Sequence, residues 1–209
     1  MKILWLLLLF CHTALAQISG TTSSGEYEGV SGNPYFIKDW SDGVIRFSSG
    51  KVIDKFKLRF NTVQNRLLLQ FSGSTFAAES GVNEFVMYTK NKKDSFLFRK
   101  GFPATDRGNE ETFYQVLERG KATLLRLVTK DIVEEKEIIA SKVSRHYQDV
   151  DLLYLYYNGS THKIDKELAP LESFPAEQRD ELKSYISQQQ LKMRSTDDFV
   201  KLVKKYNQL

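Results

Sequence analysis

The chain is dominated by short runs in which apolar and polar residues alternate. In residues 56–60 every second residue is apolar, and the same pattern returns in residues 66–71 after a polar segment. Because the side chains of a strand point alternately to opposite faces, each run predicts a strand with one buried face. The two runs therefore predict a hairpin that places Leu67, Leu69 and Phe71 in one core.

Further strands are predicted on both sides of this hairpin. Apolar or alternating runs cover residues 44–47, 52–53, 82–88, 96–98, 112–117 and 122–128, and glycine-containing or charged turns separate them. Residues 152–157, Leu-Leu-Tyr-Leu-Tyr-Tyr, are apolar on both faces, as in a central strand that is covered on both sides. Asn158-Gly159 then predicts a tight turn into a strand over residues 160–164.

Two segments lack a clear period. Residues 101–111 carry Gly, Pro and mixed charge, so we expect a long irregular segment, either a functional loop or a mobile connection. Residues 130–142 fit neither the helical nor the strand period, and their acidic centre favours an exposed connection with at most one helical turn.

Two helices are predicted near the C-terminus. The first follows Pro175, a residue suited to a first helical turn, and the second has Ser195 as N-cap, with Asp198 completing a capping box. Apolar residues then recur with helical spacing as far as Tyr206. We expect both helices to cover one face of the 152–157 strand; a membrane-surface helix is the alternative.

These elements predict a mainly β fold, an antiparallel sandwich or partly open barrel with two C-terminal α-helices packed on the sheet. We divide the chain into a signal peptide (1–16), a flexible leader (17–33), a β-rich domain (34–165) and a C-terminal helical segment (166–209) packed on the same domain.

The N-terminus has the pattern of an export signal. A basic start precedes the apolar residues 3–10, and Ala14-Leu15-Ala16 matches a cleavage site. The apolar run is short for a retained membrane anchor. A lipoprotein signal would need a small residue before Cys11, where Phe10 stands. We therefore expect a soluble exported protein that begins at Gln17.

Composition narrows the chemistry of the mature chain. Cys11 is the only cysteine and lies within the predicted signal peptide. The mature chain can therefore form no disulfide and has no thiolate for catalysis or metal binding. Without Lys2 the 30 basic residues become 29, against 26 acidic ones, and they form no basic stripe with stacking aromatics. This distribution argues against nucleic acid as a partner.

Motifs for catalysis or metal binding are missing. His146 and His162 lack the spacing of a zinc site, and neither a G-x-S-x-G elbow nor a phosphate-binding loop occurs. We therefore predict no catalytic residue, no metal and no cofactor. Glu110-Glu111 and the pair Asp149 and Asp151 are the only acids to consider for a glycosidase-like site, and solvated charge is the better explanation of both pairs.

Three segments carry a resemblance: Val44 to Phe71 around Lys57-Leu58-Arg59-Phe60-Asn61, Phe113 to Leu125, and Leu182 to Leu209 with its ending Tyr206-Asn207-Gln208-Leu209. In these segments the chain resembles uncharacterised exported β-rich proteins of the bacterial phylum Bacteroidota. The resemblance implies a location in the cell envelope, in the periplasm or at the cell surface. It implies no catalytic residue.

Together these observations favour a non-catalytic binding module of the cell envelope. Its expected partner is an envelope protein, a glycan or a lipid-like ligand, and no membrane span is expected after signal cleavage. Trp40, Tyr154 and Tyr156 are the candidate contact residues, although a core position is the stronger explanation of each of them. The alternatives are an envelope hydrolase that uses paired carboxylates and a structural accessory of an envelope complex.

Overall fold

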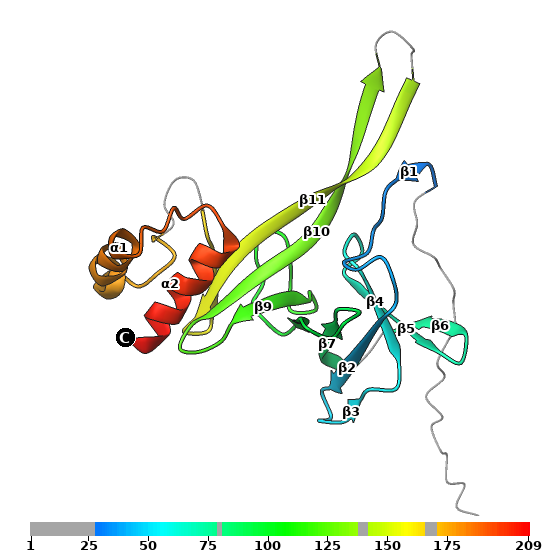
Figure 1. The fold of residues 1–209 in the computed structure, drawn as a ribbon, viewed down its shortest axis with the longest axis horizontal. Helices are drawn as coiled ribbons and strands as arrows, with labels where there is room; N and C mark the ends of the chain where they lie inside the picture. The colour runs from blue at the N-terminus through cyan, green and yellow to red at the C-terminus, as the bar shows by residue number, and fades with distance from the viewer. Residues whose placement is uncertain (1–27, 79–80, 138–141, 166–170) are drawn as a thin grey trace, which may run out of the picture.

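The computed structural model describes residues 28–209 apart from residues 79–80, 138–141 and 166–170. The predicted signal peptide and most of the predicted leader lie outside the described residues. The described chain is mainly β, with one large open sheet and two C-terminal helices packed against it (Figure 1), which confirms the predicted fold class.

Twelve strands form the sheet. In chain order they are β1 (Val30–Ser31), β2 (Ser41–Phe47), β3 (Val52–Ile53), β4 (Lys57–Asn61), β5 (Arg66–Phe71), β6 (Ser74–Ala77), β7 (Val82–Tyr88), β8 (Ser95–Arg99), β9 (Tyr114–Glu118), β10 (Thr123–Glu137), β11 (Lys142–Tyr157) and β12 (Ser160–Lys163). In space they follow the order β1-β11-β10-β9-β8-β7-β2-β4-β5-β6, with β12 beside β11 and β3 beside β2. Among the strand pairs of the described residues, only the short pair β1–β11 is parallel.

The predicted hairpin is present as β4 and β5, whose register runs from Lys57↔Gln70 to Asn61↔Arg66. Its buried face joins a core rich in phenylalanine, formed by Ile45, Leu58, Phe60, Leu67, Leu69, Val82, Phe85, Met87, Phe98, Phe113 and Val128. The prediction for Phe71 is wrong, because its side chain is 45% exposed. Phe71 lies at the turn into the edge strand β6, where its ring contacts Phe56 at the surface.

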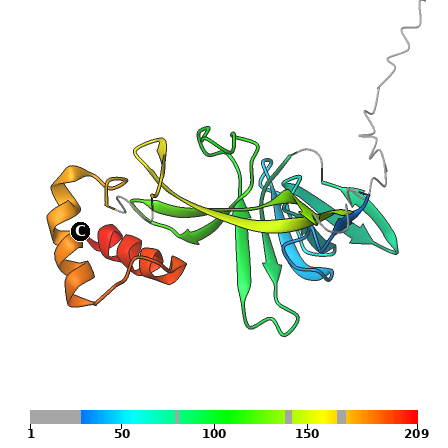
Figure 2. The ribbon, with the colours of Figure 1, turned by 90° about the horizontal axis from the view of Figure 1, so that it is seen from above.

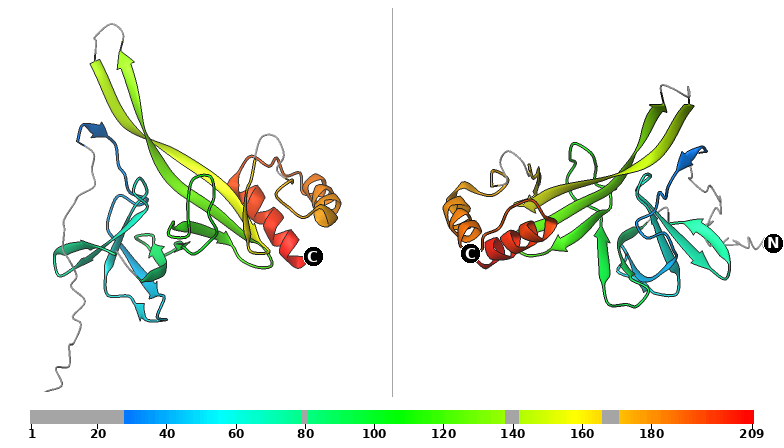
Figure 3. Two further views of the ribbon diagram at one scale, coloured as in Figure 1. Left: turned by 180° about the vertical axis from the view of Figure 1, so that it is seen from behind. Right: turned by 45° about the horizontal axis from the view of Figure 1, so that its top comes forward.

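Strands β10 and β11 form one long ribbon. They pair without interruption from Thr123↔Tyr156 to Glu137↔Lys142, and the far part of the ribbon extends beyond β9, where the short strand β1 pairs with β11 (Figures 1 and 3). The expectation of an exposed connection over residues 130–142 is therefore wrong for the described residues of that segment. Residues 130–137 form a strand because they pair with residues of β11, as Ile132 does with Tyr147, although their own sequence has no strand period.

The C-terminal helices are α1 (Arg179–Gln188), preceded by a short 3₁₀ turn at Ala176–Gln178, and α2 (Thr196–Gln208). The Ser195 hydroxyl accepts a hydrogen bond from the backbone N–H of Asp198 at 3.2 Å, which confirms the predicted cap. The helices bury their apolar stripes against β10 and β11 in a second core, formed by Ala122, Leu124, Leu153, Leu155, Ile164, Phe174, Leu182, Met193, Phe199, Leu202, Val203 and Tyr206.

The side chain of Asn207 links the end of α2 to the sheet through two hydrogen bonds. The Asn207 side-chain amide accepts a hydrogen bond from the Ala122 backbone N–H at 2.7 Å and donates one to the Ala122 carbonyl at 3.0 Å. The Asn207 amide thus makes the two hydrogen bonds that a neighbouring strand would otherwise make with Ala122, the residue just before β10. The neighbouring Gly120 makes room for it, because a Cβ there would lie 2.5 Å from Asn207.

Replacing Asn207 by Ala should therefore destabilise the protein. The backbone N–H and carbonyl of Ala122 lose their hydrogen-bond partner, which costs about 1–3 kcal/mol of stability. The higher helix propensity of alanine offsets roughly 0.5 kcal/mol of this loss. Urea denaturation of N207A measures the difference. The matched control is Gln208→Ala at the next, exposed position, which should stay close to wild type. Equal stability of the two variants would contradict the tether.

Candidate functional site

The candidate site lies on the side of the sheet opposite the helices. Cross-strand partners point to the same side of a sheet. Phe98 of the phenylalanine-rich core pairs with Gln115, Gln115 pairs with Arg126, and Arg126 pairs with Leu153, which the helices cover. Both cores described above therefore lie on one side of the sheet. The alternate residues of the same strands point to the second side. The loop of residues 101–111 covers that side where it passes β9, β10 and β11 (Figure 2).

Aromatic side chains form the floor of the second side. Phe102, Tyr114, Leu125, Leu127 and Tyr154 make a third buried cluster, with Val116, Leu152 and Tyr156 packed around it. The rings meet edge to face, with centroid distances of 5.9 Å for Phe102–Tyr114, 5.7 Å for Tyr114–Tyr154 and 5.3 Å for Phe102–Tyr156. The strand at residues 152–157 is thus covered on both faces, as predicted.

Polar contacts hold the loop against this floor. The Asp106 carboxylate accepts hydrogen bonds from the Tyr154 hydroxyl at 2.6 Å and from the Lys163 ammonium at 2.5 Å. Arg107 forms an ion pair with Asp131 at 2.7 Å. The loop is therefore an ordered part of the site rather than a mobile connection.

A glycine allows the loop to approach the floor closely. A Cβ at Gly108 would lie 2.3 Å from the Tyr114 hydroxyl, which in turn lies 2.9 Å from the Thr105 hydroxyl. No larger residue fits at this position without displacing the loop. The tyrosine hydroxyl, although buried, therefore has a hydrogen-bond partner.

The pKa values of three groups reflect this environment. The hydrogen bond from Lys163, followed by the one from Tyr154, lowers the pKa of Asp106, so the carboxyl group is ionised at neutral pH. Burial, followed by the bond to Asp106, raises the pKa of Tyr154. Burial also raises the pKa of Tyr114. Both tyrosines are therefore neutral, and Tyr154 acts as a hydrogen-bond donor.

A cleft of about 270 Å³ opens beside the aromatic floor. Its lining residues come from β8, the start of the loop, β9, the β9–β10 turn, β10 and β11: Arg99, Gly101, Phe102, Val116, Arg119, Gly120, Thr123 and Tyr156. Because Thr123 and Tyr156 are cross-strand partners, they face the cleft together. The lining combines two guanidinium groups and the Thr123 hydroxyl with the apolar or aromatic side chains of Phe102, Val116 and Tyr156, so it offers both polar and apolar contacts to a small molecule.

Three arginines surround one carboxylate next to this cleft. Arg46, Glu84 and Arg99 lie in one row across β2, β7 and β8. Glu84, whose side chain is 16% exposed, binds Arg119 at 2.6 Å and Arg46 at 3.6 Å. Within the described part of the chain Arg99 forms no ion pair, and its guanidinium lies 5.9 Å from the centre of the Phe102 ring. The group therefore carries more positive than negative charge.

A larger cleft, of about 500 Å³, lies where the β4–β5 turn meets the end of the loop. It is lined by Gln64, Asn65, Arg66, Leu67, Ala78, Val82, Lys100, Glu111 and Phe113. Lys100 and Glu111 form an ion pair there at 2.5 Å, and the Asn65 amide is bound to the Phe113 backbone by two hydrogen bonds. Its main charges and one of its amides are thus already paired, so we take the smaller cleft as the candidate site.

The three aromatic candidates from the sequence occupy different places. Tyr156 lines the cleft and Tyr154 lies beneath it as the partner of Asp106. Trp40 lies outside the site: it precedes β2, five strands from β11 in the sheet order, and its ring is 5.6 Å from the Arg59 guanidinium. The structure thus brings two of the three together.

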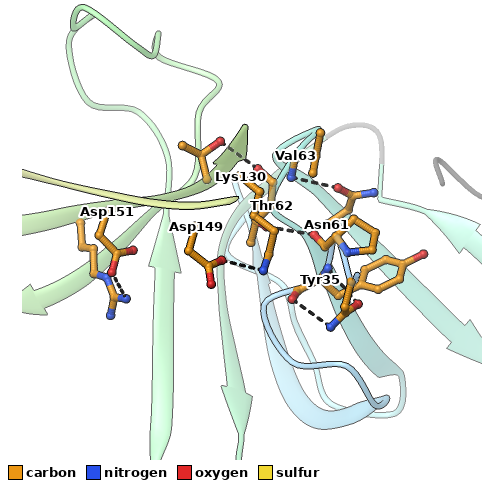
Figure 4. A network of polar contacts seen from close by, with 11 residues as sticks. Tyr35, Asn61, Thr62, Val63, Lys130, Asp149 and Asp151 are labelled. Carbon is orange, nitrogen blue, oxygen red and sulfur yellow. Dashed lines mark hydrogen bonds and ion pairs between the residues drawn. The ribbon is translucent and has the colours of Figure 1, made fainter. Parts of the chain in front are cut away.

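The paired carboxylates do not form a cleft of their own. Glu110, Glu111, Asp149 and Asp151 are all exposed. Asp149 binds Lys130 and Asp151 binds Arg126, each at 2.6 Å, where the β10–β11 ribbon passes the β4–β5 turn (Figure 4). This arrangement does not favour the hydrolase alternative, because a glycosidase needs two acids that face a substrate between them.

The sequence alone did not single out Arg99, Arg119 or Phe102. Arg99 has the only usable signal, since it follows the predicted strand at residues 96–98 and stands two residues before the long irregular segment. Arg119 resembles an ordinary turn residue. Their meeting depends on the strand order, which brings the β9–β10 turn beside β7 and β8.

Comparisons of the chain with models of known protein families, with curated proteins and with solved structures give no match. Among the residues that the structure describes, none of the helices is both long and apolar enough to cross a membrane. The same residues contain no cluster of three or more His, Cys, Asp or Glu side chains placed to hold a metal ion.

The loop contacts predict a pH-dependent contribution of Asp106 to stability. Because the pKa of this carboxyl is lowered in the folded protein, its contribution is present above the unfolded value of about 4 and disappears as the pH falls through the folded pKa. Asp106→Asn should therefore lower Tm at pH 7, and the difference from wild type should shrink towards pH 3. Thermal unfolding across this range measures it.

The matched control for this experiment is Asp39→Asn, an exposed carboxylate outside the loop. It should change Tm little at either pH. A deficit of D106N that is as large at pH 3 as at pH 7 would contradict the charge-dependent contacts, because a purely steric effect does not titrate.

Proposed function

We propose that the protein is an exported, non-catalytic module that binds a small ligand in the cleft at Arg99 and Tyr156. The observation that carries the proposal is a ready-formed cleft whose aromatic wall and covering loop are held by Asp106 and Arg107. A site that is ordered before binding loses little conformational entropy when a ligand enters.

The lining of the cleft supports binding rather than catalysis. Its described residues offer guanidinium, hydroxyl and apolar groups, but no Asp, Glu, His, Cys or Ser. General acid–base catalysis at neutral pH needs a group that can both accept and release a proton in that range, which neither Arg99 nor Thr123 does. The lining can hold and orient a ligand, but it does not supply a proton acceptor or a strong nucleophile.

The export part of the proposal rests on the first sixteen residues. Cleavage after Ala16 should give a mature protein that begins at Gln17. The measurement is the intact mass and N-terminal peptide of the protein secreted or released from the envelope of a bacterial host, and Ala16→Leu should slow processing. Recovery of the chain with its first residues intact in the cytoplasm would contradict export.

Filling the cleft tests the binding function. Thr123→Trp places an indole beside Tyr156, within the ligand volume. Wild-type protein from its native envelope, after mild purification, should release a small molecule on denaturation, and T123W should release little or none. The control is Thr75→Trp on the edge strand β6, which does not line the cleft and should release the wild-type amount.

Circular dichroism of T123W and T75W must match wild type for this comparison to hold. The mass spectra of released molecules then decide between the possibilities. A species that is present in wild type and T75W but depleted in T123W supports the cleft as the binding site. No enriched species, or equal amounts from all three proteins, would overturn the proposed function.

A second candidate function is that of a structural accessory in an envelope complex, and the ribbon favours it. Ile132 is 36% exposed and Val143 is 50% exposed on the part of the ribbon that extends beyond β9. Two-stranded ribbons are only marginally stable alone in water. A partner that covers these residues would stabilise the ribbon.

A further inference from the structure

The charge around the cleft restricts the ligands it can bind. Arg99 and Arg119 both line it, and Glu84 is the carboxylate that compensates them. Glu84 already binds Arg119 and lies beside Arg46, so the Arg99 guanidinium keeps an uncompensated charge. A cation would meet net repulsion here, whereas an anion would meet a guanidinium with free hydrogen-bond donors.

Part of the cleft lining is suited to an apolar group. Phe102, Val116 and Tyr156 provide it, and the Arg99 guanidinium lies near the Phe102 ring. Because guanidinium groups have a planar fork of donors, Arg99 is suited to bind a carboxylate while its face remains near the ring. Charge and apolar surface thus lie close together in the lining of one small cleft.

Resting on the proposed function, we propose that the ligand is a small organic anion with an aromatic or similarly flat apolar body. Its carboxylate, or a comparable anionic group, lies at Arg99 with Arg119 beside it. Its body lies against Phe102 and Tyr156. The volume of about 270 Å³ admits a small molecule, or one terminal unit of a larger one.

A neutral glycan fits this lining less well. Sugar hydroxyls need several acceptors as well as donors, and the described lining contributes no carboxylate or amide side chain. A bare inorganic anion would leave the aromatic wall without a partner. The combination of a guanidinium and an aromatic wall therefore favours a ligand that has both an anionic and an apolar part.

Three probes of nearly equal shape test the inference: 2-naphthoate, its neutral amide, and the cationic 2-naphthylmethylammonium ion. Isothermal titration calorimetry at low and high salt measures each. Naphthoate should bind at millimolar concentration or below, about ten-fold or more tightly than the amide, because a charge-assisted hydrogen bond is lost in the amide. The cation should not bind. Naphthoate affinity should fall with salt, since Arg99 is exposed.

Variants test whether Arg99 provides the positive charge that binds the anion. Arg99→Gln should weaken naphthoate about ten-fold and leave the amide unchanged. Arg194→Gln removes the same charge from an exposed position outside the cleft and should have no effect. Glu84→Gln should tighten naphthoate binding, because it removes the compensating carboxylate. A merely structural role of these residues would not produce effects of opposite sign.

The outcomes separate this inference from the proposed function. Suppose that T123W abolishes naphthoate binding, whereas R99Q, E84Q and salt leave it unchanged. This result would overturn the proposal that the ligand is an anion, but the cleft would remain a binding site. Failure of naphthoate to bind would also overturn the anion class. If, in addition, T123W and wild type released the same molecules from the envelope, the binding function itself would be wrong.

Discussion

The long antiparallel pairing of β10 with β11 is the interaction on which the rest of the structure depends. The inner part of this ribbon presents Leu153 and Leu155 to the helices and Tyr154 and Tyr156 to the loop. Because a shift by one residue would exchange the two faces, the register decides both the core and the cleft. The pairs from Thr123↔Tyr156 onward determine which side chains meet on each side.

Two side-chain amides form hydrogen bonds with backbone groups at strand ends, in place of a neighbouring strand. Asn207 binds both backbone groups of Ala122, and Asn65 binds both backbone groups of Phe113. These two contacts lie just before β10 and just before β9, so each fixes the point at which a strand enters the sheet. Both of these strands contribute to the lining of the cleft, β9 with Val116 and β10 with Thr123.

Charge on the second side of the sheet follows from the same register. The row Arg46, Glu84 and Arg99 is formed by direct cross-strand partners on three neighbouring strands, and Arg119 joins it from the β9–β10 turn. Three guanidinium groups thus surround one carboxylate, which forms ion pairs with two of them, Arg46 and Arg119. Opposite charges on neighbouring strands stabilise a sheet only modestly, and the excess of positive charge beside an aromatic wall is the feature on which the proposed ligand class rests.

What the sequence determined by itself is local. Alternation predicted the β4–β5 hairpin, the run at 152–157 predicted a strand covered on both faces, and Ser195 with Asp198 predicted the start of α2; each is present. These features depend on neighbours within a few residues, where period and capping are physical constraints. Tyr156, predicted as a contact residue, lines the cleft, but the sequence could not distinguish it from Trp40, which lies elsewhere.

Only the tertiary structure decided the rest. Residues 130–137 are strand because β11 pairs with them, although their own pattern suggested an exposed connection. Phe71 is exposed because β5 ends at the sheet edge, which alternation cannot show. Arg99, Arg119 and Glu84 meet because the strand order places β7, β8 and the β9–β10 turn side by side. Contacts between residues far apart in the chain depend on that order, and a local pattern does not specify it.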